Sequence, residues 1–221
     1  MDETLRRSAA HVLVADVAAP LLDEAATHHL RRVLRLRAGA SVTVTDGAGA
    51  WRGCRLTTEG IEPDGPVTFA APACDVTVAV APPKGDRLEW LVQKCTEVGV
   101  ARLVLLDAER SVVRWDAERA AMQLDRLRRI AVEAAMQSRR VWLPELTGPL
   151  PAGDVLAGAA IGEPGGRAIG PADACIAVGP EGGWTPAEVA CARDRVTLGP
   201  HVLRVETAAV VAATLMVAAA S

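Results

Sequence analysis

The sequence predicts an α/β fold with a mostly parallel sheet and helices on both faces, preceded by a small β-barrel domain. From residue 76 on, apolar runs of strand length alternate with segments of helical periodicity, which is typical of parallel sheets. Residues 1–72 instead hold short alternating runs broken by glycine and aspartate. The chain has 221 residues, half of them hydrophobic, so it is long enough for one large or two small domains.

The N-terminal region, residues 1–72, is expected to form the barrel. Its clearest signal is Asp46-Gly47 between the alternating runs 42–45 and 51–56, because Asp-Gly between such runs is typical of a hairpin. The other expected elements are strands at 12–14 and 67–70, a helix of one or two turns at 27–36 and a linker at 71–74.

The C-terminal region, residues 73–221, alternates strands with helices. Apolar residues recur at helical spacing over 86–98, and Gly99 is the expected stop of that helix. A further helix begins at residues 185–188, Thr-Pro-Ala-Glu, a capping box with proline at the first helical position. The other expected elements are strands at 76–81, 102–106, 175–178 and 196–198, a helix–strand passage around 156–161, and helices at 116–137 and from 206 onward.

Composition excludes several classes of protein. The formal net charge of −3 gives no general sign of nucleic acid binding, and the lack of tyrosine argues against a sheet that stacks RNA bases. The five cysteines form no C-x-x-C pair, which excludes the usual zinc patterns and argues against a disulfide framework. The start of the chain is no signal peptide, and the apolar run 208–220 is shorter than the roughly 20 residues of a membrane span. We therefore expect a cytoplasmic protein without metal or membrane.

The strongest local signal for a ligand site is the loop 179–184, Gly-Pro-Glu-Gly-Gly-Trp, between a buried strand and the capped helix. Glycines let the backbone approach a ligand closely, and open α/β sheets bind ligands at the carboxyl ends of their strands. The loop matches neither the P-loop nor the dinucleotide-binding fingerprint. The alternative is an ordinary tight turn.

A second signal follows the next strand, where Gly199 is followed by Arg204 and Glu206 at the start of a helix. The two charged residues could simply cap that helix, where the dipole favours a carboxylate. Two such loops from successive parallel strands would, however, lie side by side and could form one pocket. No Ser-His-Asp or Cys-His arrangement is apparent, so the residues alone leave the chemistry open.

Basic residues gather in the N-terminal region although the whole chain is slightly acidic. Residues 28–55 hold six arginines and one acid, which favours a nucleic acid partner. Solvated surface charge is the alternative, especially for arginines spread along the helix 116–137. The candidate RNA-binding residues are Arg31, Arg32, Arg35, Lys84, Arg87, Arg139 and Arg140.

These blocks, in this order, resemble the RsmE family of SPOUT methyltransferases, which methylate N3 of a uridine in bacterial 16S ribosomal RNA. The resemblance covers nearly the whole chain. The blocks that carry it are 28–35 followed by Asp46-Gly47, then 84–94 with 96–99, 109–113, 179–183 and 198–208.

The resemblance implies a PUA-like β-barrel, a C-terminal domain with a deep trefoil knot, and a homodimer that acts on the small ribosomal subunit. It also implies S-adenosylmethionine bound among loops at 161–164, 179–183 and 198–208. As implied catalytic residues, Arg204 and Arg7 (or Arg6) stabilise the base or its phosphate, and Glu206 positions the cofactor or accepts a proton. The implied cofactor-binding residues are Ile161, Gly162, Glu163, Val178, Gly179, Pro180, Glu181, Gly182, Gly183, Leu198, Gly199, Leu203, Arg204, Thr207 and Ala208.

The chain departs from the family pattern at four positions. Met136 stands where the family has a glutamate, His201 where it has an arginine, and Val205 where it has a threonine. Trp184, in place of a phenylalanine, is a mild departure. Two other functions stay open: methylation of another RNA position such as a ribose 2′-hydroxyl, and a ribosome-assembly factor that binds RNA without turnover.

Overall fold

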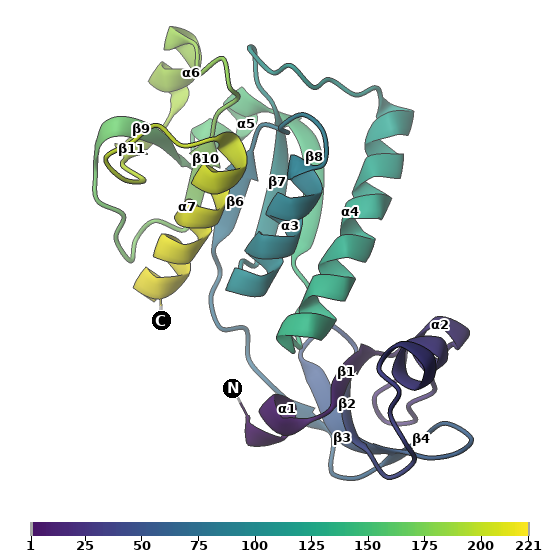
Figure 1. The fold of residues 1–221 in the computed structure, drawn as a ribbon. Helices are drawn as coiled ribbons and strands as arrows, with labels where there is room; N and C mark the ends of the chain where they lie inside the picture. Colours follow the sequence, from purple (N-terminus) through teal and green to yellow (C-terminus); the bar gives the residue numbers. More distant parts are fainter. Residues whose placement is uncertain (1, 221) are drawn as a thin grey trace. The chain divides into compact units, whose positions relative to one another are not determined.

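A computed structural model describes residues 2–220, which divide into two compact units (Figure 1). The N-terminal unit runs to Pro72 and also includes Val132–Leu143. The C-terminal unit holds Ala73–Ala131 and the chain from Pro144 on. The helix α4, Ala117–Ser138, therefore contributes residues to both units.

The N-terminal unit is built on a five-stranded sheet. Its strands are β1 (Ala10–Leu13), β2 (Ser41–Thr45), β3 (Ala50–Leu56), β4 (Ile61–Pro63) and β5 (Thr68–Phe69), and its short helices are α1 (Glu3–Arg7), α2 (Glu24–His28) and the π-helical turn His29–Val33. β1 runs parallel to β2, whereas β2, β3 and β4 form an antiparallel series and β5 pairs with β3. The predicted hairpin is confirmed: Oδ1 of Asp46 accepts the amide hydrogens of Ala48 (2.7 Å) and Ala50 (3.1 Å) in the β2–β3 turn.

The segment Val132–Leu143 closes the N-terminal unit. The indole nitrogen of Trp142 donates to the carbonyl oxygen of Ala70 (2.7 Å), and its ring meets Phe69 edge-on at 5.8 Å. The guanidinium of Arg139 donates to the hydroxyl (3.0 Å) and carbonyl (2.7 Å) oxygens of Ser8. A segment distant in sequence thus supplies part of the framework of this unit.

His11 is a buried polar residue on β1. Its Nδ1 lies 2.9 Å from the hydroxyl oxygen of Thr43, and its Nε2 lies 3.1 Å from the carbonyl oxygen of Arg140. Burial lowers the pKa of His11 to about 4, and the charge of Arg139 acts in the same direction, against the hydrogen bond to Arg140. Because the carbonyl can only accept, Nε2 donates and the Thr43 hydroxyl donates to Nδ1 of a neutral imidazole.

We expect the N-terminal unit to lose stability as the pH falls from about 6.5 to about 4. The unfolded chain then binds a proton on His11 that the folded unit excludes, so the free energy of unfolding drops by at most about 3 kcal/mol. The melting temperature should fall more steeply with decreasing pH in the wild type than in His11→Gln. His28→Gln, which changes an exposed histidine of the same unit, should behave like the wild type. Equal slopes in all three proteins would contradict the prediction.

The C-terminal unit contains a six-stranded sheet in which all pairings are parallel, which confirms the predicted mostly parallel sheet. In spatial order the strands are β11 (Asp194–Val196), β9 (Ala160–Arg167), β10 (Cys175–Val178), β6 (Thr77–Val80), β7 (Arg102–Asp107) and β8 (Glu145–Pro151).

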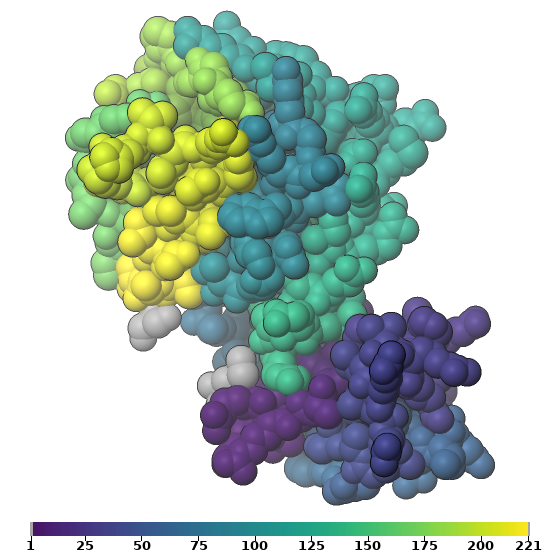
Figure 2. All heavy atoms as spheres, viewed as in Figure 1, coloured from purple at the N-terminus to yellow at the C-terminus, as the bar shows by residue number. Residues whose placement is uncertain are grey.

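Helices cover both faces of this sheet, as predicted. α3 (Arg87–Val98), the first part of α4 and α7 (Val205–Ala220) pack on one face, and α5 (Ala152–Leu156) and α6 (Pro186–Cys191) pack on the other (Figure 1). In Figure 2 the yellow atoms of α7 lie beside the blue atoms of α3. Alternate residues of each strand serve the two faces: Val78 and Val80 join the first core, Ala79 joins the second.

Three details of this unit differ from the sequence expectations. β8 was not predicted, because Pro149 and Pro151 argue against a strand; the edge of a sheet is where proline is tolerated. The loop implied at 161–164 is a bulge of residues 162–166 within β9, because Ile161 pairs with Arg195 and the next pair is Arg167 with Val196. The strand expected at 196–198 ends at Val196.

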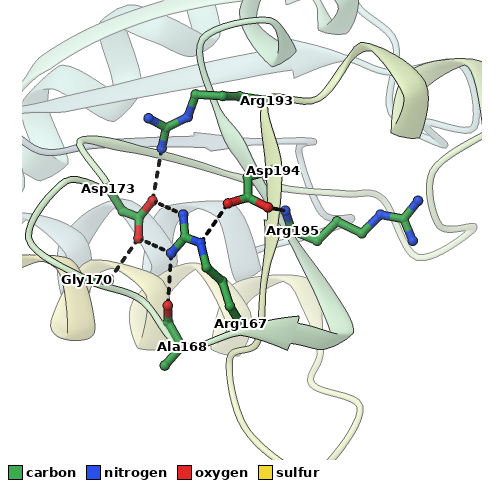
Figure 3. Close-up of polar contacts among 7 residues, drawn as sticks. All are labelled: Arg167, Ala168, Gly170, Asp173, Arg193, Asp194 and Arg195. Carbon is green, nitrogen blue, oxygen red and sulfur yellow. Dashed lines mark hydrogen bonds and ion pairs between the residues drawn. The ribbon is translucent and has the colours of Figure 1, made fainter.

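An ionic cluster holds the β9–β10 connection against β11 (Figure 3). Asp173 is buried and accepts two hydrogen bonds from Arg167 (2.7 and 2.8 Å), one from Arg193 (2.9 Å) and one from the amide of Gly170 (2.9 Å). Arg167 also bonds Asp194 (2.6 Å). The bonds from Arg167 lower the pKa of Asp173 to about 2, so the cluster stays ionised at neutral pH.

Candidate cofactor-binding and catalytic site

A cavity of about 360 Å³ opens in the C-terminal unit where three chain segments meet. The segments are part of β9 (162–164), the β10–α6 connection (178–184) and the β11–α7 connection with the start of α7 (197–208). We call it the three-loop cavity. Because β11, β9 and β10 are neighbouring parallel strands, the segments at or beyond their carboxyl ends come together at one edge of the sheet.

Most of the expected cofactor-binding residues line this cavity. The residues that do so are Gly162, Glu163, Val178, Gly179, Pro180, Glu181, Gly183, Leu198, Gly199, Leu203, Arg204 and Ala208. Ile161, Gly182 and Thr207 are not among the lining residues; Ile161 is fully buried in the core on the other face of the sheet. The lining also includes Pro164, Trp184, His201, Val202 and Val205, which lie in the expected loops but were not named as cofactor-binding residues. Thr197 lines the cavity from outside those loops.

The β10–α6 connection needs its glycines for close packing and for a turn. A Cβ on Gly179 would stand 2.8 Å from the ring of Trp184, which itself lines the cavity. Gly183 has a φ of +69°, and its amide donates to the carbonyl oxygen of Pro180 (2.8 Å). The predicted capping box is present, with Thr185 as N-cap of α6 and Glu188 as its partner.

The same connection is fastened to the chain after β7. Glu188, a buried residue, accepts the amide hydrogen of Glu109 (2.9 Å), and Arg110 donates to the carbonyl oxygens of Gly182 and Trp184 (both 3.2 Å). Burial acts to raise the pKa of Glu188, but hydrogen bonds from the Thr185 and Glu109 amides outweigh it and the pKa is lowered. The Glu188 carboxylate is therefore ionised, and its hydrogen bonds hold in place the connection that forms part of the cavity wall.

The β11–α7 connection brings the charged residues of the second predicted loop to the cavity. Gly199 has a φ of +138°, a conformation that side chains rarely adopt. Arg204 is exposed and lines the cavity, and within residues 2–220 its guanidinium has no hydrogen bond or ion pair. Its carbonyl oxygen accepts from the amide of Ala208 (2.8 Å) as α7 begins.

Glu206 lies in the first turn of α7, directly after the lining residues Arg204 and Val205. Its side chain is only 12 % exposed, and Oε1 stands 3.7 Å from Nε of Arg87 on α3. Oε2 is buried and has no hydrogen-bond partner among the described atoms. An acceptor left open in this way is suited to receive a proton or an N–H group from a ligand.

The other candidate residues lie outside this cavity. In the N-terminal unit Arg7 pairs with Glu3 (2.7 Å), and Arg31 donates to the carbonyl oxygen of Thr57 (2.8 Å). Arg139 binds Ser8, and the backbone of Arg140 binds His11, so both take part in the framework of that unit. The exposed RNA-binding candidates are Arg32 and Arg35 in the N-terminal unit and Lys84 and Arg87 in the C-terminal unit.

Within residues 2–220, no group of three or more His, Cys, Asp or Glu side chains could hold a metal ion. In that same range, no helix has the length and hydropathy to span a membrane.

Two family models match the chain. An RNA methyltransferase domain matches residues 70–217, and an RNA methyltransferase PUA domain matches residues 22–60. A ribosomal RNA small subunit methyltransferase E from Synechocystis is 33 % identical over 86 % of this chain and 70 % of its own length. The chain belongs to the RsmE family. Another member, from Mycobacterium tuberculosis, is 34 % identical over 83 % of this chain and 80 % of its own length.

Solved structures agree with membership of the RsmE family. A ribosomal RNA small subunit methyltransferase E from Neisseria gonorrhoeae, bound to S-adenosylmethionine, superposes with a TM-score of 0.79 at 28 % identity, over 94 % of this chain and 96 % of that one. A methyltransferase from Legionella pneumophila, also with the cofactor, gives a TM-score of 0.80 at 26 % identity, over 96 % and 98 %. The fold of this chain is thus that of cofactor-binding methyltransferases.

Proposed function

We propose that this protein transfers a methyl group from S-adenosylmethionine to N3 of a uridine in the 16S ribosomal RNA of the small subunit, in the cytoplasm. The observation that carries the proposal is the three-loop cavity, where the glycine-rich segments gather around Arg204 and beside Glu206. Relatives that share the fold carry this cofactor and bear the name of small-subunit RNA methyltransferases.

The residues of the three-loop cavity fit the cofactor. A volume of about 360 Å³ lies within the range of small-molecule sites, roughly 300–1,000 Å³. Apolar side chains such as Leu198 and Leu203 suit an adenine ring, and the glycine backbones offer hydrogen-bonding groups at close range. The carboxylates of Glu163 and Glu181 suit hydroxyl and amino groups. When bound, S-adenosylmethionine supplies an electrophilic methyl group on a sulfonium.

The chain must activate the nitrogen of the uracil. N3 carries a proton and is a poor nucleophile until that proton leaves, and the base then bears negative charge. Arg204, whose guanidinium is unpaired among the described residues, is placed to stabilise that charge. Glu206, with its open buried oxygen, accepts the proton or orients the cofactor. We assign to Arg7 the same role as to Arg204, which is to stabilise the base or its phosphate.

The domains, the oligomeric state and the RNA contacts are assigned in line with this function. We assign residues 1–72 to a PUA-like barrel that binds RNA, and residues 73–221 to a SPOUT methyltransferase domain with a trefoil knot and a homodimer interface. Among the candidate RNA-binding residues, exposed Arg32, Arg35, Lys84 and Arg87 are the ones with side chains open to phosphate. Hydrogen bonds within the N-terminal unit involve Arg31, Arg139 and Arg140, and they stabilise the fold that presents Arg32 and Arg35.

The deciding experiment incubates the protein with labelled S-adenosylmethionine and small subunits from a strain that lacks this methylation. The RNA is then digested to nucleosides and separated. Label in 3-methyluridine supports the proposal, and label in a 2′-O-methylated nucleoside assigns another RNA position. Cofactor binding by calorimetry without any transfer would point to an assembly factor without turnover.

A further inference from the structure

A second cavity, of about 270 Å³, lies in the C-terminal unit between the β6–α3 connection and the beginning of α4. We call it the Trp115 cavity. Lys84 comes from the β6–α3 connection, Val113 and Trp115 from the β7–α4 connection, and Arg119, Gln123 and Arg126 from successive turns of α4. No residue of the three-loop cavity lines it, so it is a separate site.

The charges of the Trp115 cavity favour an anion. Lys84 and Arg119 are exposed, and neither side chain has a hydrogen bond or an ion pair within residues 2–220. Arg126 is paired with Glu89 at 2.6 Å, which neutralises both groups. Asp86 is the remaining acid, so two unpaired cations face one carboxylate. This surplus suits a phosphodiester, the repeating anion of RNA.

The walls of the cavity suit a nucleobase. The Trp115 ring is half-buried against the core that contains Leu88 and Leu127, so its position is fixed by packing. A fixed aromatic ring beside cations is the combination with which proteins stack bases of single-stranded nucleic acids. Gln123 adds an amide that can donate to and accept from the edge of a base.

The position of Arg87 and Glu206 connects the Trp115 cavity to the three-loop cavity. Arg87 stands between Asp86 and Leu88, which line the Trp115 cavity. Its Nε lies 3.7 Å from Oε1 of Glu206, which directly follows the residues Arg204 and Val205 of the other cavity. This ion pair therefore joins the chain segments that carry the two cavities, and both cavities lie at the edge of the sheet where its parallel strands end.

We propose that the Trp115 cavity binds a nucleotide that flanks the methylated uridine, in single-stranded form. Its base stacks on Trp115, and its phosphate contacts Lys84 and Arg119. This subsite rests on the proposed methyl transfer to RNA and assigns it a second recognition point beside the reacting base.

The test compares the wild type with Trp115→Ala, Arg119→Gln and Arg129→Gln in methyl transfer to small subunits. Arg129 is an exposed arginine of the same helix that does not line the cavity, so Arg129→Gln is a matched loss of one charge. We expect Trp115→Ala to raise the KM for small subunits by about 5- to 100-fold, the range of one lost base stack, with kcat and cofactor affinity nearly unchanged. Arg119→Gln should raise KM about 5-fold and reduce the salt dependence of RNA binding by about one counterion.

The outcomes separate the subsite from the proposed function. A wild type without methyl transfer activity would contradict the proposed function itself. An active wild type with Arg119→Gln equal to Arg129→Gln would overturn the subsite alone. Because Trp115→Ala could disturb the core, Trp115→Phe serves as a second variant and should keep most of the binding. The quenching of tryptophan fluorescence by a single-stranded RNA hexanucleotide should be smaller in Trp115→Phe than in the wild type, and equal quenching would contradict stacking at this ring.

Discussion

Replacing Arg204 by alanine should lower the rate of methyl transfer to small subunits by about 10²–10³-fold, the usual effect of removing one group that stabilises transition-state charge. Arg204 lines the three-loop cavity, and its guanidinium has no partner within residues 2–220, so it is available to the uracil as charge develops. Single-turnover transfer with saturating S-adenosylmethionine measures the chemical step. Calorimetry should show cofactor affinity changed by less than about 5-fold.

Three further variants define the role of Arg204. Arg204→Lys keeps the charge but loses the planar fork, so it should recover only part of the rate. Arg195→Ala removes an exposed arginine of β11 that does not line the cavity and should transfer like the wild type. Glu206→Gln, which keeps the shape of the side chain but cannot take up a proton, should also be slow. Full turnover in Arg204→Ala and Glu206→Gln would remove both residues from the mechanism.

Replacing Gly179 by alanine should weaken S-adenosylmethionine binding by about 10- to 100-fold. The new methyl group would lie 2.8 Å from Cε2 of Trp184, so the ring or the backbone must shift, and both line the three-loop cavity. Overpacking of this kind costs about 1–3 kcal/mol, and here the shift deforms the binding surface itself. Titration calorimetry with the cofactor measures the loss.

The matched control for this substitution is Gly153→Ala. Gly153 lies in α5, and an added Cβ there would meet nothing within 4 Å. This variant should bind the cofactor like the wild type and be at least as stable, because alanine favours a helix. Wild-type affinity in Gly179→Ala would show that Gly179 and Trp184 do not shape the cofactor site.

The cavity could be predicted from the sequence because its signals are local. Three glycines next to a capping box mark the β10–α6 connection, and Gly199 marks the β11–α7 connection. Parallel strands then place these connections at one sheet edge. The resemblance of ordered motifs supplied the cofactor and the family, which the residues by themselves left open.

Contacts between distant segments could not be predicted in this way. Nothing in the sequence near Gly182 indicates that Arg110 holds its carbonyl oxygen, or that Glu188 also accepts from Glu109. The strand β8 was not predicted because it contains two prolines, and a sheet tolerates proline only at an edge position such as this one. Trp184 was recognised as a mild departure in a motif, but its packing on Gly179 depends on the three-dimensional turn.

The N-terminal unit is discontinuous in the chain, and this affects how the protein can be dissected. A fragment that stops at Pro72 lacks Trp142, Arg139 and the carbonyl group that receives the His11 hydrogen bond. Such a fragment would deprive Phe69 of its ring contact with Trp142 and leave a buried imidazole without its acceptor, so it is a poor substitute in RNA affinity measurements. A faithful minimal version would graft residues 132–143 back on through a designed connector, or supply them as a separate peptide that restores the fold in trans.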